Sequence, residues 1–199
     1  MSQGPTPVVE SALMEAVRAV IVERGYQGLT LGAVAAESEF DRTLVERHYA
    51  DVGDVVASFL AYERDRFVES VLVAPTDPAL RLRTLLDALV GLDHDDEVLA
   101  PYVAFQAAAL TDERISDALD ALEQEMFDAV VETVEDGVAE GSFEPVDPAS
   151  TAAVVLSVRD AALRRAARGA DPTVLHDALD TFVLDRLRTG SQRRAEPDA

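Results

Sequence analysis

Apolar residues recur along almost the whole chain in steps of three and four, which is the period of an amphipathic α-helix. The first stripe runs from Val9 through Leu13 and Val17 to Ile21, and Gly25 ends it. Breaks rich in Gly, Pro and Asp separate eight further stripes. These lie over about 30–36, 41–49, 51–73, 78–92, 97–110, 112–140, 149–168 and 173–188. No segment reads convincingly as a β-strand, so the pattern predicts an all-α protein of about nine helices.

The lengths of these helices divide the chain into two parts. Three short helices come first, and about six longer helices follow. The division falls near residues 50–55, at the start of the fourth helix. We therefore expect an N-terminal domain over 1–52, a C-terminal helical domain over 53–190 and a disordered tail over 191–199.

The second and third short helices have the composition of a helix-turn-helix. Thr30 and Asp41 are suited to cap their N-termini, and Val34-Ala35-Ala36 offers a small contact surface. Phe40 would plug the turn between them. The outward side chains of the third helix would meet base edges or phosphates in a major groove. They are Arg42, Thr43, Glu46, Arg47 and His48.

At this point residues 16–60 resemble the TetR family of transcriptional regulators. The matching positions are Gly25-Tyr26, Thr30, Val34-Ala35, Tyr49 and Asp54-Val55. Residues 100–145 resemble the ligand-binding region common in that family, in which a long helix ends in G-x-x-x-G-x-F, here Gly137, Gly141 and Phe143. The resemblance spans residues 9 to about 188 and implies a ligand-responsive regulator, a repressor, that binds a palindromic DNA operator as a homodimer.

The resemblance also implies three sets of site residues. The DNA-binding set is Thr30, Arg42, Thr43, Arg47, His48 and Tyr49. The pocket for a small effector is Phe59, Tyr62, Phe67, Leu85, Tyr102, Phe105, Gln106, Met126 and Phe127. The dimer interface, on the last two helices, is Val155, Leu156, Arg159, Leu163, Leu175, Leu179 and Phe182. Taken singly, most pocket residues could equally fill the core, and the arginines beside Arg159 could form a solvated edge.

Three positions depart from the family pattern. Glu39 stands where the turn usually has Gly, so either the turn has another shape or Glu39 has a positive φ. Glu46 stands where the recognition helix usually carries a Tyr that touches phosphate, and Val52 replaces a Lys that meets the DNA backbone. These changes leave open a second interpretation, a protein of the same fold that binds a small molecule or partner and has lost DNA binding.

The charge sharpens this question. The formal net charge is -21, with 38 Asp and Glu against 17 basic residues, all of them Arg. Residues 1–60 hold four arginines against nine carboxylates, a net charge of −5. A GC-rich genome or a salt-rich cytoplasm would each explain this composition, and we favour a halophilic source. In about 1 M salt, repulsion is screened within about 3 Å, so an acidic helix can still approach DNA. Alternatively, Arg42 and Arg47 only pair with Glu39 and Glu46.

Other classes of protein have little support. The chain has no Cys, no apolar run long enough for a membrane span and no signal peptide, so we expect a cytoplasmic protein. No phosphate loop, HExxH or GxSxG motif is present, and we expect neither an enzyme nor a cofactor. The segment DHDDE at 93–97 could ligate a metal, but a solvated connector with helix-capping Asp fits it better, so no metal site is expected.

Overall fold

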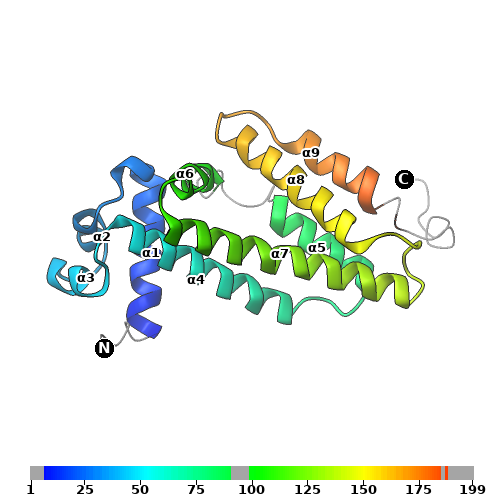
Figure 1. Cartoon of the computed structure of the whole chain (residues 1–199), viewed down its shortest axis with the longest axis horizontal. Coiled ribbons are helices and arrows are strands. Elements are labelled where there is room, and N and C mark those ends of the chain that lie inside the picture. The colour runs from blue at the N-terminus through cyan, green and yellow to red at the C-terminus, as the bar shows by residue number, and fades with distance from the viewer. Residues whose placement is uncertain (1–6, 91–98, 185–186, 188–199) are drawn as a thin grey trace. The chain divides into compact units, whose positions relative to one another are not determined.

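The computed structural model describes residues 7–90, 99–184 and 187, and every regular element in these ranges is helical (Figure 1). The all-α prediction is therefore confirmed. The elements are α1 (Pro7–Arg24), a 3₁₀ turn (Tyr26–Gly28), α2 (Leu31–Glu37), α3 (Arg42–His48), α4 (Val52–Leu72), α5 (Pro78–Val90), α6 (Leu99–Ala109), α7 (Glu113–Ala139), α8 (Pro148–Ala166), α9 (Thr173–Leu179) and a π-helical turn (Asp180–Leu184). None of the described helices has the length and apolar character that crossing a membrane requires.

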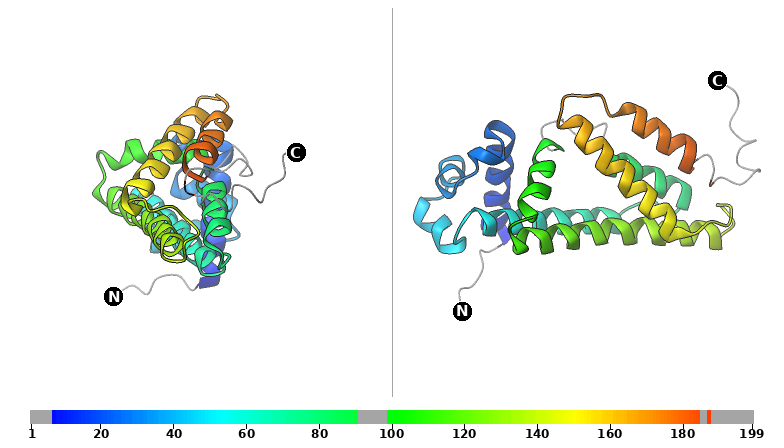
Figure 2. Two further views of the ribbon diagram at one scale, coloured as in Figure 1. Left: turned by 90° about the vertical axis from the view of Figure 1, so that its right-hand side faces the viewer. Right: turned by 45° about the horizontal axis from the view of Figure 1, so that its top comes forward.

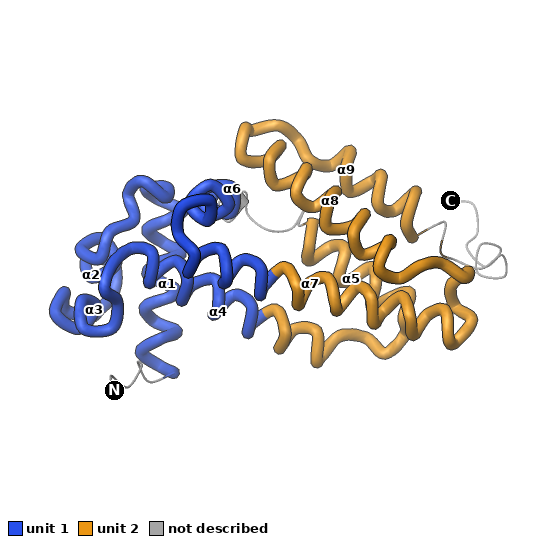
Figure 3. The backbone as a smooth tube through the Cα atoms, viewed as in Figure 1, with its two compact units in different colours: residues 1–66, 96–122 blue, residues 67–95, 123–199 orange. Residues whose placement is uncertain are grey.

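The chain forms two compact units (Figure 3). The first comprises residues 1–66 and 96–122, and the second comprises residues 67–95 and 123–199. The helices α4 and α7 each contribute residues to both units. The domain boundary expected at 52/53 lies inside the first unit and remains a prediction.

In the first unit, α1 supplies the core against which the two short helices are arranged (Figure 2). Its apolar stripe is buried, including Leu13, Val17 and Val20. It packs on α2, and α2 in turn packs on α3. Val34 on α2 and Val45 on α3 are both buried. Because α2 and α3 have seven residues each, too few to be stable alone, this packing holds them helical.

The caps of α2 and α3 are those that the sequence predicts. The Thr30 hydroxyl accepts the Ala33 N–H at 3.0 Å, and Asp41 Oδ1 accepts the Leu44 N–H at 2.8 Å. Gly25 ends α1 with a φ of 68°, which a side chain would strain, and the 3₁₀ turn that follows was not predicted.

The turn between α2 and α3 settles the question raised by Glu39. No non-glycine residue in the described ranges has a positive φ, so Glu39 is not strained and the turn has another shape. The Ser38 hydroxyl organises it by accepting the Phe40 N–H at 3.3 Å.

In the second unit, α5 packs on α8 and α9. Arg81 Nη2 on α5 donates to Asp136 on α7 at 2.5 Å, and Asp147 caps α8 by accepting the Ser150 N–H at 2.8 Å. The last predicted helix, over 173–188, is less regular than expected. The α-helical hydrogen bonding ends at Leu179 and gives way to the π-helical turn.

The G-x-x-x-G-x-F motif has a steric cause. The backbone of Gly137, near the end of α7, lies under the buried ring of Phe143, and a Cβ on Gly137 would lie 2.0 Å from that ring. The Phe143 N–H also donates to the Gly137 carbonyl at 2.9 Å, and Gly141 turns the chain with a φ of 76°.

We therefore expect Gly137→Ala to lower the free energy of unfolding by about 1–3 kcal/mol, because the new methyl group must displace a packed ring. Urea denaturation followed by circular dichroism measures this change. The control is Gly32→Ala on α2, where the added Cβ finds only ordinary contacts at 3.9 Å or more. That substitution should be neutral or slightly stabilising. A Gly137→Ala protein as stable as the wild type would contradict this packing.

Candidate nucleic-acid interface

The exposed side of α3 is the candidate surface for nucleic acid. Its inward side is fixed by Val45, which is buried, and by Leu44, which is half-buried. The remaining exposed positions form two rows along the helix, since residues four apart lie on the same face. These rows are Arg42 with Glu46, and Thr43 with Arg47.

The first row is an ion pair. Arg42 Nε donates to Glu46 Oε1 at 2.6 Å, and the two side chains are 70% and 45% exposed. An exposed pair of this kind contributes about 0.3–0.5 kcal/mol on a helix, so a better partner can replace either member.

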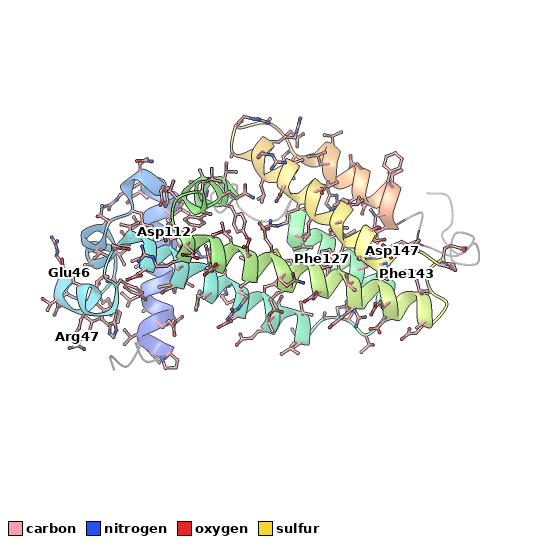
Figure 4. All side chains as sticks on the ribbon, in the orientation of Figure 1. Glu46, Arg47, Asp112, Phe127, Phe143 and Asp147 are labelled. Atoms are coloured by element: carbon pink, nitrogen blue, oxygen red, sulfur yellow. The ribbon has the colours of Figure 1, made fainter. Side chains whose placement is uncertain are left out.

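The second row presents an available cation. Arg47 is exposed and makes no ion pair with any of the described residues. Figure 4 shows Glu46 and Arg47 projecting outward from α3. The sequence left open that Arg42 and Arg47 only pair with neighbouring carboxylates. Among the described residues this is true of Arg42 and is not true of Arg47.

The other predicted DNA-binding residues are placed differently. Thr30 is exposed at the start of α2, where its oxygen already serves as the cap, and His48 is half-buried at the end of α3. Tyr49 is only 4% exposed and belongs to the core. Burial, with the nearby Glu10 carboxylate adding to it, raises the pKa of the Tyr49 hydroxyl to about 12, so this group stays neutral.

A charged cluster that the sequence analysis missed lies directly after the recognition helix. Arg114, the second residue of α7, contacts the carboxylates of Asp51, Asp54 and Asp112, all within the first unit. More than fifty residues separate Arg114 from two of these partners, so no local pattern could have identified the contact.

Five of the predicted pocket residues fall in the first unit. Phe105 is the centre of an aromatic group, with its ring centroid 6.0 Å from Tyr26, 6.1 Å from Phe59 and 6.5 Å from Tyr102, all in edge-to-face geometry. The hydroxyl of Tyr62 shares a hydrogen bond with that of Ser11 at 3.1 Å. Gln106 is half-buried rather than enclosed.

The other four predicted pocket residues fall in the second unit. Leu85 and Met126 are buried, whereas Phe67 and Phe127 are half-buried. Their burial agrees equally with a pocket lining and with a core, so their role remains a prediction.

The residues expected at a dimer interface separate into two groups. Val155, Leu163, Leu179 and Arg159 are buried within the single chain, and Leu156 and Leu175 are half-buried. Phe182 is 72% exposed. It borders a groove of about 420 Å³. The lining of this groove is Val146, Asp147, Ser150, Thr151, Val154, Phe182, Val183 and Leu187.

The acidic segment at 93–97 lies outside the described residues. Among the residues that the structure does describe, no three His, Asp or Glu side chains are grouped so that they could hold a metal ion.

The helix-turn-helix followed by long helices defines a class of DNA-binding regulators, and comparison with known proteins gives the family. Residues 78–188, more than half of the chain, match the family model described as the BetI-type transcriptional repressor, C-terminal. The chain therefore belongs to the TetR family of transcriptional regulators, which are not enzymes, and carries a C-terminal region of the BetI type.

Solved structures agree with this assignment. A TetR transcription regulator from Haloarcula marismortui is 26% identical, covers 92% of this chain and 100% of its own, and superposes with a TM-score of 0.82. A regulator from Saccharomonospora viridis, solved in complex with choline, is 16% identical, covers 92% of this chain and 100% of its own, with a TM-score of 0.73, which shows the shared fold. A search of curated protein sequences found no significant match.

Proposed function

We propose that the protein is a homodimeric repressor that reads a palindromic DNA operator with α3 and releases it when a small effector binds. The observation that carries this proposal is the exposed guanidinium of Arg47 on the outward face of α3, which forms no ion pair within the described ranges. An arginine in this position can bond the O6 and N7 atoms of guanine with two parallel N–H donors.

The surplus of carboxylates restricts the conditions of binding. In dilute salt the net charge of −5 on residues 1–60 opposes the phosphates, and phosphate neutralisation normally supplies much of the affinity. Near 1 M salt, screening within about 3 Å suppresses that repulsion, and little counterion release is left to gain. Hydrogen bonds to base edges and the shape of the DNA then determine affinity. We therefore expect this protein to bind its operator best at the salt concentration of a salt-rich cell.

Selection of operators from a random duplex library tests the proposal. The selection is run in parallel at about 0.15 M and 1 M salt, where the screening lengths are about 8 Å and 3 Å. Enrichment of a palindrome, strongest at the higher concentration, supports the repressor. A failure to enrich any sequence at either concentration rejects it and favours the alternative, a binding protein of this fold that no longer reads DNA.

The aromatic group around Phe105 supports the effector half of the proposal. It joins α4, α6 and the 3₁₀ turn, so a ligand that displaced one of these rings would disturb the segments that directly precede α2 and follow α3 in the chain. Choline is a suitable first probe because a protein of the same fold binds it. An effector must bind the DNA-free conformation more tightly than the DNA-bound one. Choline that binds without changing operator affinity would be rejected as the effector.

Phe182 is the expected anchor of the dimer. It projects from a surface that also includes the half-exposed Val154, and a buried aromatic anchor commonly contributes about 2 kcal/mol or more to an interface. We expect Phe182→Asp to shift the protein to monomers in sedimentation-velocity experiments at micromolar concentration. The matched control is Leu110→Asp, which changes another exposed apolar residue, in the first unit, and should leave the dimer intact. Unchanged dimerisation of Phe182→Asp would place the interface elsewhere.

A further inference from the structure

The guanidinium of Arg114 holds three carboxylates at once. Its Nε and Nη2 donate to the two oxygens of Asp112 at 3.0 and 2.7 Å, while Nη1 donates to Asp54 at 2.5 Å. Nη2 also lies 3.1 Å from Asp51. Arginine suits this role because its donors are fixed in a planar fork, which a lysine cannot reproduce. Figure 4 marks Asp112, the residue that precedes α7.

Two of these carboxylates are bonded to the backbone that follows the recognition helix. Asp51 accepts the Asp54 N–H at 3.1 Å and so caps α4, while the Asp54 side chain accepts the Ala50 N–H at 2.9 Å. Ala50 follows directly after Tyr49, whose N–H closes the last turn of α3 on Val45 at 3.0 Å. Hydrogen bonds therefore link Arg114 through Asp54 to Ala50, which is covalently joined to the residue that closes α3.

Gly53 leaves the space that the guanidinium occupies. A Cβ on Gly53 would lie 2.3 Å from both Arg114 Nη2 and Asp112 Oδ2. Both atoms are at the ends of flexible side chains, so an alanine here would push the guanidinium aside at little cost to the fold. The absence of a side chain at Gly53 therefore allows Arg114 and Asp112 to meet beside the start of α4.

The charges of the cluster explain why its arrangement depends on Arg114. Hydrogen bonds from the Asp54 N–H and from Arg114 hold the pKa of Asp51 below its usual value, and Arg114 does the same to Asp112. Arg114 is the single cation that contacts these three side chains. Removing that cation leaves three like charges on two segments, the start of α4 and the start of α7, which repel each other in dilute salt.

We propose that Arg114 is a positioning residue for operator binding, through which the BetI-type C-terminal region holds the end of the recognition helix. Arg114 lies inside the matched residues 78–188, whereas α3, Asp51 and Asp54 all precede them. Surface ion pairs of this exposure contribute little to overall stability. The role of the cluster is therefore local: it fixes the position of the C-terminal end of α3 and contributes little to the free energy of unfolding. The role in operator binding rests on the proposed function.

Amide hydrogen exchange of the DNA-free protein in dilute salt tests the positioning directly. Arg114→Ala should increase exchange of the amides over residues 45–50 by about tenfold or more, as expected for a locally released segment. Gly53→Ala should act in the same direction without any change in charge. Arg114→Lys should restore slow exchange only in part, because an ammonium group lacks the fixed fork of donors that reaches three carboxylates at once.

The matched control is Arg81→Ala, which breaks the ion pair with Asp136 in the second unit. It should leave exchange over residues 45–50 unchanged. If Arg114→Ala also leaves these amides unchanged, or accelerates exchange across the whole chain equally, the positioning role is wrong. This readout needs no DNA, so it decides the role of Arg114 in holding α3 even if the repressor proposal fails.

The operator provides the second readout. Wild-type protein should prefer one spacing between half-sites, because the two recognition helices of a dimer are held at a defined separation. In Arg114→Ala, the difference in affinity between that operator and versions with one base pair added or removed should shrink by about tenfold. An equal loss of affinity at every spacing would show a general effect and overturn the proposal. If wild-type protein selects no operator at all, the proposed function fails instead.

Discussion

Phe105→Ala should destabilise the protein by about 3–5 kcal/mol, the cost typical of emptying a buried aromatic site. Phe105 is 1% exposed and touches three other rings edge to face, from α4, α6 and the 3₁₀ turn. Its removal leaves a cavity where these elements meet, and the loss of edge-to-face contacts, worth about 0.5–1.5 kcal/mol per pair, is part of this cost. Urea denaturation followed by circular dichroism measures the change, and a thermal midpoint lower by about 10 °C should accompany it.

Phe105→Leu is the graded control. It keeps most of the volume and loses the three ring contacts, so its cost should be about 1.5–2.5 kcal/mol, less than that of Phe105→Ala. If Phe105→Ala proves no more destabilising than Phe105→Leu, the site is able to collapse and Phe105 does not hold these elements together. If Phe105→Ala is strongly destabilised as expected, ligand-binding experiments on the aromatic group must use the leucine variant, since the alanine variant would confuse unfolding with loss of a binding site.

Features governed by short-range rules could be predicted from the sequence. Thr30 and Asp41 were expected to cap α2 and α3, and both do, because a cap depends only on the side chain and the next three residues. The helices and their order follow from apolar periodicity in the same way. The 3₁₀ turn after Gly25 and the π-helical turn after Leu179 were missed, since no comparable local signal marks them.

Features that depend on distant parts of the chain could not be predicted. The apolar stripes of α8 and α9 identify buried faces, but periodicity does not say what covers them. Val155, Leu163 and Leu179 were assigned to a dimer interface, and the chain's own helices already bury them. The Arg114 cluster was hidden for a related reason. In a chain with 38 acidic residues, any arginine has many possible partners, and only the fold selects among them.

The exposed face of α3 shows where charge counting alone would mislead. Nine carboxylates in residues 1–60 argue against DNA binding, yet those on or near α3 do not neutralise Arg47. Asp41 is occupied as a helix cap, and Glu46 pairs with Arg42. What matters for base reading is the availability of a particular donor, rather than the sum of charges around it.

Arg47→Ala should therefore lower affinity for the selected operator by about 1–3 kcal/mol, or roughly 5–150-fold, at 1 M salt. Because Arg47 makes no ion pair with the part of the chain that the structure describes, nearly all of its interaction with guanine is gained on binding. Arg42→Ala should have a smaller effect, since Arg42 must first leave Glu46, to which it bonds at 2.6 Å. Fluorescence anisotropy with labelled operators measures both changes.

The operator set used in this measurement separates base reading from phosphate contact. If Arg47 reads guanine, its removal should relax preference at one base pair of each half-site and leave binding to unrelated duplexes unchanged. If it contacts phosphate instead, affinity should fall uniformly and the slope of affinity against salt should decrease by about one. The control, Arg83→Ala on α5 in the second unit, should change neither. Wild-type affinity in Arg47→Ala at 1 M salt would show that Arg47 does not read the operator, and wild-type affinity in both Arg42→Ala and Arg47→Ala would argue against α3 as the reading helix.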